Sequence, residues 1–151
     1  MATQLLSRED TTVIATVRSL SENVVTVLNR INKARDSHLH IVKLDSLMTT
    51  DATAAASEVQ SALGIDNIDV VIANAGISRV YGLVKATPAD EMEVHFRINA
   101  MGPLLLFQSF LPLLEKSQSP KFVAISTVLR ALTTRATCSS PSLPMHQARR
   151  R

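Results

Sequence analysis

Aromatic and sulfur-bearing residues are scarce in this sequence, which has no tryptophan, one tyrosine and one cysteine. Aromatic residues make up 3% of the chain and hydrophobic residues 46%, so any core must be built from Val, Ile, Leu and Ala. The single thiol, Cys138, excludes an internal disulfide and a multi-cysteine metal site, and it fits a reducing compartment. We therefore expect a cytoplasmic protein.

Long apolar runs are also missing. No run approaches the roughly 20 residues of a membrane span, and the first ten residues have no signal-peptide core, so no membrane association is expected. The net charge of +3 comes from arginines that all lie after residue 128, namely Arg130, Arg135, Arg149, Arg150 and Arg151. Without them acids outnumber bases, which argues against a nucleic-acid-binding domain. The histidines (His38, His40, His95 and His146) do not stand at metal-ligand spacing from Cys or acids, so no metal site is predicted.

Strand-like and helix-like segments alternate along the first 128 residues. Short, apolar, β-branched runs predict strands over 12–17, 40–44, 68–73 and 122–125. Between them, helices are predicted over 21–34 with Ser21 as N-cap, over 51–63 with Gly64 as C-cap, and from Thr87 to about 114 with a break at Gly102-Pro103. This alternation predicts an α/β fold with a doubly wound parallel sheet. Residues 129–151, rich in Ser, Pro and Arg, are predicted to be a disordered tail.

An ordered series of motifs is the most informative feature. The apolar strand over 68–73 ends in Asn74-Ala75-Gly76, Asn99 follows on the next helix, and the strand over 122–125 ends in Ser126-Thr127. The series resembles the middle of a short-chain dehydrogenase/reductase, closest to the fungal ketoreductases of that family, over roughly residues 4 to 128. The resemblance implies an incomplete Rossmann-like sheet that lacks the first strand and the C-terminal third. Residues 1–128 would be a partial dinucleotide-binding domain.

The resemblance implies an NADP site. Arg18, at the end of the second family strand, would contact the ribose 2′-phosphate, although a solvated arginine is the alternative. Asp45 would lie near the adenine, and a turn-capping aspartate is equally consistent with the sequence. Asn74, Ala75 and Gly76 would border the cofactor, because glycine lets the backbone pass close to it.

The same resemblance implies catalytic roles. Asn99 would hold a water of the proton relay, unless it only breaks the helix. Ser126 and Thr127 stand where the family has paired serines, the second of which donates a hydrogen bond to the substrate carbonyl. Here that second hydroxyl is Thr127, whose methyl group adds bulk.

Two family motifs have no counterpart at their usual places in these 151 residues. The glycines (Gly64, Gly76, Gly82 and Gly102) do not form the Gly-rich diphosphate loop. No Tyr-x-x-x-Lys pair follows Thr127. Tyr81 and Lys85 match that spacing, but they precede the helix start and include Gly82, so we do not assign them to catalysis. We expect both ends of the family sequence to lie outside this chain.

We therefore expect a relative of NADP-dependent ketone reductases that acts on a small-molecule ketone or alcohol, with this chain alone inactive. Without the first strand, the strands at Thr12 and His40 would be separated from those at Ile68 and Phe122, which predicts marginal stability. The alternative is a non-catalytic fragment that forms homo- or hetero-oligomers through the helix over 104–114. Nucleic-acid binding by the tail is a third, less favoured hypothesis.

Overall fold

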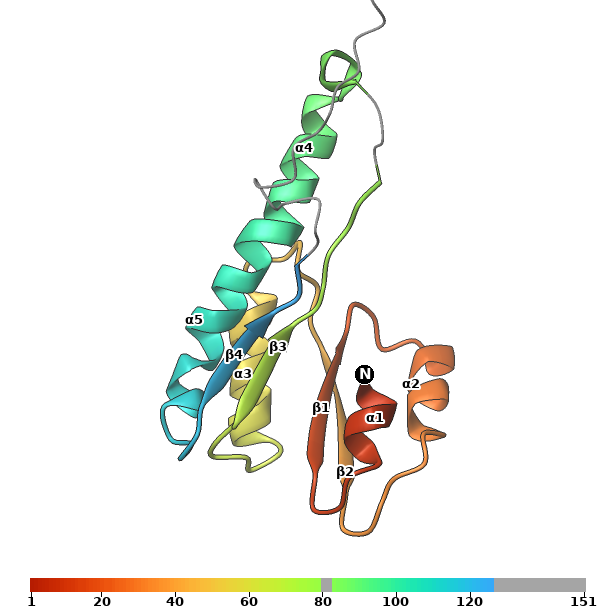
Figure 1. Ribbon diagram of the computed structural model, residues 1–151, viewed down its shortest axis with the longest axis vertical. Coiled ribbons are helices and arrows are strands. Elements are labelled where there is room, and N and C mark those ends of the chain that lie inside the picture. The colour runs from red at the N-terminus through yellow and green to blue at the C-terminus, as the bar shows by residue number, and fades with distance from the viewer. Residues whose placement is uncertain (80–82, 127–151) are drawn as a thin grey trace, which may run out of the picture.

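The computed structural model describes residues 1–79 and 83–126. Its elements, in chain order, are α1 (Ala2–Leu6), β1 (Thr12–Val17), α2 (Glu22–Asn29), β2 (His38–Lys43), α3 (Asp51–Ser61), β3 (Val70–Ala73), η1 (Val84–Ala86), α4 (Ala89–Phe96), η2 (Arg97–Met101), α5 (Gly102–Leu114) and β4 (Lys121–Ala124). Strands alternate with helices, as the sequence predicts (Figure 1).

The strands form two separate parallel pairs. β1 pairs with β2, with Thr12 opposite His38, and β3 pairs with β4, with Val70 opposite Lys121. In Figure 1 all the labelled strands point the same way, and β3 and β1 are the neighbouring members of the two pairs. The predicted separation of the strands is therefore confirmed: β1 and β3 each have one edge without a partner strand among the described residues.

One core ties the two pairs together, and it is mostly aliphatic but includes Phe110, so the prediction of a core of Val, Ile, Leu and Ala alone is wrong. Its buried side chains come from β2, α3, β3 and α5, and they are Val42, Ala55, Ala56, Val59, Val71, Phe110, Leu113 and Leu114. Ile14 of β1 and Phe122 of β4 pack against this cluster. Neighbouring residues of a strand face opposite sides, and Val13 is buried on the other face, where α1 contacts β1. Helices thus cover both faces of the β1–β2 pair, which is the doubly wound arrangement.

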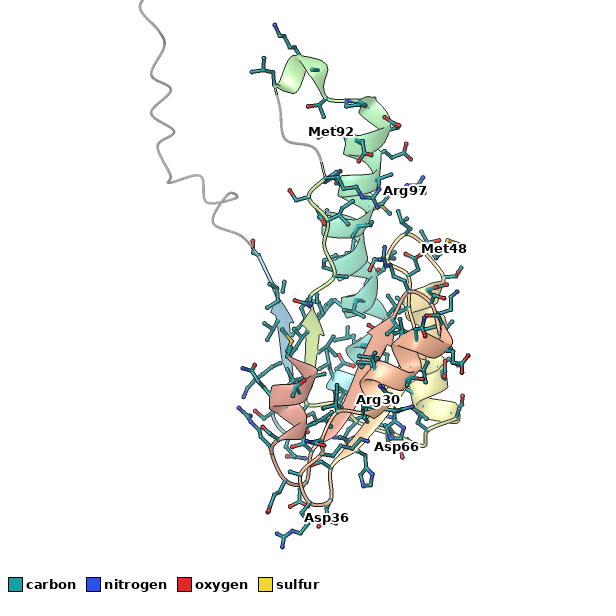
Figure 2. All side chains as sticks on the ribbon, turned by 90° about the vertical axis from the view of Figure 1, so that its right-hand side faces the viewer. Arg30, Asp36, Met48, Asp66, Met92 and Arg97 are labelled. Carbon is teal, nitrogen blue, oxygen red and sulfur yellow. The ribbon has the colours of Figure 1, made fainter. Side chains whose placement is uncertain are left out.

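The helices α4, η2 and α5 follow one another as a long rod that extends past the strands (Figure 1). The chain stays helical through the predicted break at Gly102-Pro103, and the irregularity is the wider π turn η2 directly before it. Pro103 has no N–H to donate to the preceding turn, and the irregular π turn directly before it is consistent with that missing bond. Figure 2 shows Met92 and Arg97 on the part of the rod beyond the strands.

Several predicted boundaries are wrong. The helix predicted over 21–34 ends at Asn29, because the following residues turn back toward α1, where the Ala34 N–H donates to the Leu6 carbonyl. Thr87 does not cap α4, since its hydroxyl donates to the Leu83 carbonyl and Pro88 is the N-cap residue.

The other differences are smaller. β3 begins at Val70, since the Ile68 N–H donates to the Leu113 carbonyl of α5 and not to a strand. β2 begins two residues earlier than predicted, and β4 covers 121–124 in place of 122–125. Helix α3 ends at Ser61, and Gly64 follows with a φ of +66°, a left-handed conformation that glycine adopts at little cost. Within the described ranges, no helix is both long and apolar enough to cross a membrane.

Candidate functional site

The carboxyl ends of the strands collect most of the predicted site residues. Arg18 directly follows β1 and Asn74 directly follows β3, while Asp45 and Ser126 stand two residues after β2 and β4. Because the strands all point the same way, these residues lie along one edge of the molecule (Figure 1). In open parallel sheets, ligands bind outside this edge.

Asn99 makes the best-defined polar contact of the edge. From the π turn η2, its side-chain carbonyl accepts the Ile77 N–H and its amide donates to the Ile77 carbonyl, each at 2.8 Å. The pair of bonds fixes the backbone just after the Asn-Ala-Gly turn. Asn99 is thus more than a helix-breaking residue, since its side chain holds the segment that leaves β3.

Gly76 lies close to the side chain of Asn99. A Cβ added at Gly76 would lie 3.4 Å from the side-chain oxygen of Asn99, at the edge of ordinary van der Waals contact. The structure thus shows Gly76 close to Asn99, and the close approach to a cofactor stays a prediction. No hydrogen bond of the Asn74 side chain is found among the described residues, and Asn74, Ala75 and Gly76 are all exposed.

His95 is a contributor that the sequence interpretation missed. Its Nε2 accepts the Arg79 N–H at 3.1 Å, so the proton of the neutral ring lies on Nδ1, which is 2.6 Å from the Glu91 carbonyl oxygen. His95 and Asn99 stand four residues apart and therefore share one side of the helix, from which both hold the segment after Gly76. The four-residue spacing of His95 and Asn99 is the feature of the sequence that could have predicted this shared role.

Asp45 has the role of a turn residue. Its carboxylate accepts the Leu47 N–H at 3.0 Å, and its own N–H donates to the Asp51 carboxylate at 3.0 Å. Lys43 lies 3.2 Å from the same Asp51 carboxylate. The Asp45 N–H, with a smaller contribution from Lys43, holds the pKa of Asp51 below its ordinary value, against a desolvation effect that raises it. The hydrogen bond with Leu47 supports the turn role of Asp45, and its contact with the adenine stays a prediction.

The remaining predicted residues are not brought into contact with these groups. Arg18 and Ser126 are exposed, and Thr127, Tyr81 and the tail lie outside the described residues. Across residues 1–79 and 83–126, no group of three or more His, Cys, Asp or Glu side chains could hold a metal ion.

The described residues fit part of a dinucleotide. Arg18 and the Asn74–Gly76 turn are exposed at the ligand-binding edge, so a nucleotide phosphate and ribose could reach them. The diphosphate is not matched, because the glycines of the chain do not supply a loop of free backbone N–H groups. The edge thus has exposed residues that would fit a nucleotide phosphate and ribose, and it has no cradle for the diphosphate among the described residues.

Parallel strands joined by helical crossovers, with polar residues at their carboxyl ends, define a Rossmann-like α/β protein. The short chain dehydrogenase family model matches residues 1–137. The chain belongs to the short-chain dehydrogenase/reductase family of oxidoreductases.

Known relatives agree with this assignment. The chain is 39% identical over 145 residues to the norsolorinic acid ketoreductase nor1 of Dothistroma septosporum, covering 95% of this chain and 54% of the relative. It is 41% identical over 123 residues to the short-chain dehydrogenase srdF of Neurospora crassa, covering 81% and 48%. The crystal structure of the NADPH-bound carbonyl reductase from chicken fatty liver matches with a TM-score of 0.57 at 28% identity, covering 68% and 40%. The chain thus spans about half the length of the curated relatives that it matches.

Proposed function

We propose that these residues form the central part of an NADP-dependent ketone reductase, and that the 151-residue chain alone does not turn over. The observation that carries the proposal is the pairing of Asn99 with Ile77, directly after the Asn-Ala-Gly turn at the ligand-binding edge. The ketoreductase and carbonyl reductase names of the relatives support the reaction class. A cytoplasmic location belongs to the proposal, supported by the low cysteine content.

Each exposed residue at the edge has a role in this proposal. When bound, the nicotinamide would supply hydride to the carbonyl carbon of the ketone. Ser126 would orient the carbonyl oxygen by a hydrogen bond, together with Thr127. Arg18 would bind the 2′-phosphate, because an always-charged guanidinium matches phosphate oxygens in pairs. Asn99 would act as a positioning residue for the Asn74–Gly76 turn.

The expected lack of turnover has two physical reasons. The alkoxide formed from a ketone needs a proton donor, and no Tyr-x-x-x-Lys pair follows Ser126 in the sequence. The diphosphate also lacks its cradle of backbone N–H groups, so the cofactor would be held mainly at its 2′-phosphate end. We therefore expect the chain to bind NADPH weakly and not to reduce a ketone.

NADPH fluorescence and NADPH consumption test the two parts separately. We expect weak binding of NADPH, about ten- to a hundredfold tighter than that of NADH, because charge-assisted hydrogen bonds to the 2′-phosphate contribute about 1.5–3 kcal/mol. Arg18→Ala should remove the preference, whereas Arg30→Ala, a second exposed arginine that follows α2, should leave it intact. Equal binding of both nucleotides would refute the NADP assignment. Clear turnover of aromatic ketones would refute the inactivity.

A second candidate function is association with another family member or a second copy. Large apolar side chains are exposed along the rod α4–η2–α5: Met92 is 60% exposed, Phe96 61%, Leu104 53% and Phe107 36%. Single exposed apolar residues are ordinary, but a stripe along one long helix marks an interaction surface. Phe96→Glu should weaken co-purification with a full-length relative or self-association in light scattering, while Leu20→Glu, at a similarly exposed site in the loop after β1, should not. Equal effects of the two changes would exclude this surface.

A further inference from the structure

The contacts of the His95 ring require one protonation state. A backbone N–H can only donate, so the bond of 3.1 Å from the Arg79 N–H to Nε2 needs an Nε2 without a proton. The proton then lies on Nδ1, which donates to the Glu91 carbonyl oxygen at 2.6 Å. Only the neutral imidazole makes both bonds at once. The contact between α4 and the segment after β3 therefore depends on the charge of this ring.

The side chain of Glu91 lies beside the same ring without a hydrogen bond. Its Oε2 atom is buried, has no hydrogen-bond partner among the described residues, and lies 3.6 Å from Nδ1 of His95. A carboxylate oxygen withdrawn from water is stabilised by a positive charge close to it. A protonated imidazole would supply that charge. The His95 side chain is 22% exposed, so a proton from the solvent can reach the ring.

The other charged groups around the ring do not replace this carboxylate. On the helix, Glu93 is paired with Arg97 at 2.8 Å. The π turn η2 places the uncharged Asn99 on the same side as His95. The facing segment carries the guanidinium of Arg79, which opposes a second positive charge. Among the described residues, the carboxylate that favours the charged ring thus comes from α4, and the N–H that favours the neutral ring comes from the segment after β3.

We propose that His95 is a pH-sensitive switch for the segment after β3. With a neutral ring, the segment is held at two points, Ile77 by Asn99 and Arg79 by His95. Protonation turns Nε2 into a donor, so the bond from the Arg79 N–H is lost and the charged ring pairs with Glu91. The segment is then held at Ile77 alone. The inference does not depend on the proposed reductase activity.

The ordinary chemistry of histidine sets the range in which the switch acts. Histidine is the side chain whose charge normally changes between about pH 5 and pH 8. The segment that it controls leaves the ligand-binding edge directly after the Asn74–Gly76 turn. Acidification in this range would therefore loosen the chain next to that edge without unfolding the core.

Nuclear magnetic resonance of the full isotope-labelled chain between about pH 8 and pH 5 tests the proposal. Nitrogen shifts of the ring follow its protonation, and the scalar coupling across the N–H···N bond reports the contact of His95 with Arg79. We expect this coupling to disappear as the ring becomes charged. Protection of the Arg79 amide, corrected for the intrinsic pH dependence of exchange, should fall about three- to tenfold, because one hydrogen bond is lost. The Ile77 amide is the internal control and should keep its protection, since the Asn99 side chain does not titrate.

Three variants separate the parts of the switch. His95→Gln keeps an acceptor near the position of Nε2 and has no titrating group, so protection of the Arg79 amide should no longer change with pH. Glu91→Gln should move the midpoint of the change to lower pH, because the charged ring loses its carboxylate partner. His38→Gln, at an exposed histidine of β2, is the matched control and should leave the midpoint where it is.

Four results would overturn the proposal. The first is a coupling between Arg79 and His95 that is absent at the alkaline end or that persists when the ring is charged. The second is an equal loss of protection at Ile77 and Arg79, which would indicate general unfolding. The third is a change at Arg79 that still follows pH in His95→Gln, and the fourth is a midpoint that does not fall in Glu91→Gln.

Discussion

The contact between Asn99 and Ile77 gives the sharpest test of the site. Asn99→Ala removes two hydrogen bonds of 2.8 Å and leaves the Ile77 N–H and C=O without these partners. Each bond contributes about 1 kcal/mol net, and alanine is up to about 0.7 kcal/mol more favourable than asparagine within a helix. We therefore expect a net loss of about 1–2 kcal/mol, concentrated at the segment after Gly76.

Two measurements read this loss. Urea unfolding should show a lower midpoint with an unchanged slope, since the exposed area changes little. Hydrogen exchange of the Ile77 amide should become roughly tenfold faster, since every 1.4 kcal/mol corresponds to a factor of ten. The matched control is Asn23→Ala in α2, an exposed helical asparagine, which should be neutral or slightly stabilising.

A second substitution separates the hydrogen bonds from packing. Asn99→Asp keeps the oxygen that accepts the Ile77 N–H but places a second oxygen against the Ile77 carbonyl. This variant should lose stability at neutral pH and regain part of it on acidification, because only a protonated carboxyl can donate to that carbonyl. Unchanged exchange of the Ile77 amide in Asn99→Ala would refute the assigned role, as would an Asp variant whose stability does not depend on pH in this way.

Three further predictions concern the fold. Leu114→Ala, at a position 3% exposed, should lower the free energy of unfolding by about 2–5 kcal/mol, while Leu104→Ala, at 53% exposed, should change it by less than about 1 kcal/mol in urea melts. Gly64→Ala should lower the free energy of unfolding by about 1 kcal/mol although there is open space around the added Cβ, because φ is +66°. Gly64→Asn should lower it less, since asparagine tolerates this conformation better. Equal losses in the two variants would exclude the backbone explanation. The carboxylate of Asp51 has a lowered pKa in the folded protein, so it contributes stability at neutral pH that is lost as the pH falls below about 4. Asp51→Asn should therefore make the free energy of unfolding fall less steeply between about pH 4 and pH 2. A series of melts from about pH 7 to pH 2 in which the variant loses stability as steeply as the unchanged protein would count against this role.

Strand positions could be predicted well because the information is local. The run Thr12–Val17 coincides with β1, and the other three strands are displaced by one or two residues. Short β-branched runs have few alternatives to a buried strand. Helix ends were less predictable: the pattern over 21–34 continues past Asn29, but contacts with α1 end the helix there.

The sequence could identify residues of the candidate site, but it could not predict which groups they contact. Asn99 and Gly76 were selected separately from motifs, whereas their approach to 3.4 Å depends on how η2 lies against the segment after β3. For Asp45, the sequence left a turn and a nucleotide contact equally open. The hydrogen bonds with Leu47 and Asp51 show the turn.

The sequence by itself determined the alternation of strands and helices, a core that is mostly aliphatic, and the family, because each rests on residue types and spacings along the chain. Only the tertiary structure decided that His95 and Asn99 jointly hold the segment after Gly76, and that the two separate strand pairs pack on one shared core. The physical reason is distance along the chain. Hydrogen bonds between residues 16 or 22 positions apart, and a core shared by separate strand pairs, depend on how whole elements pack, which no local pattern records.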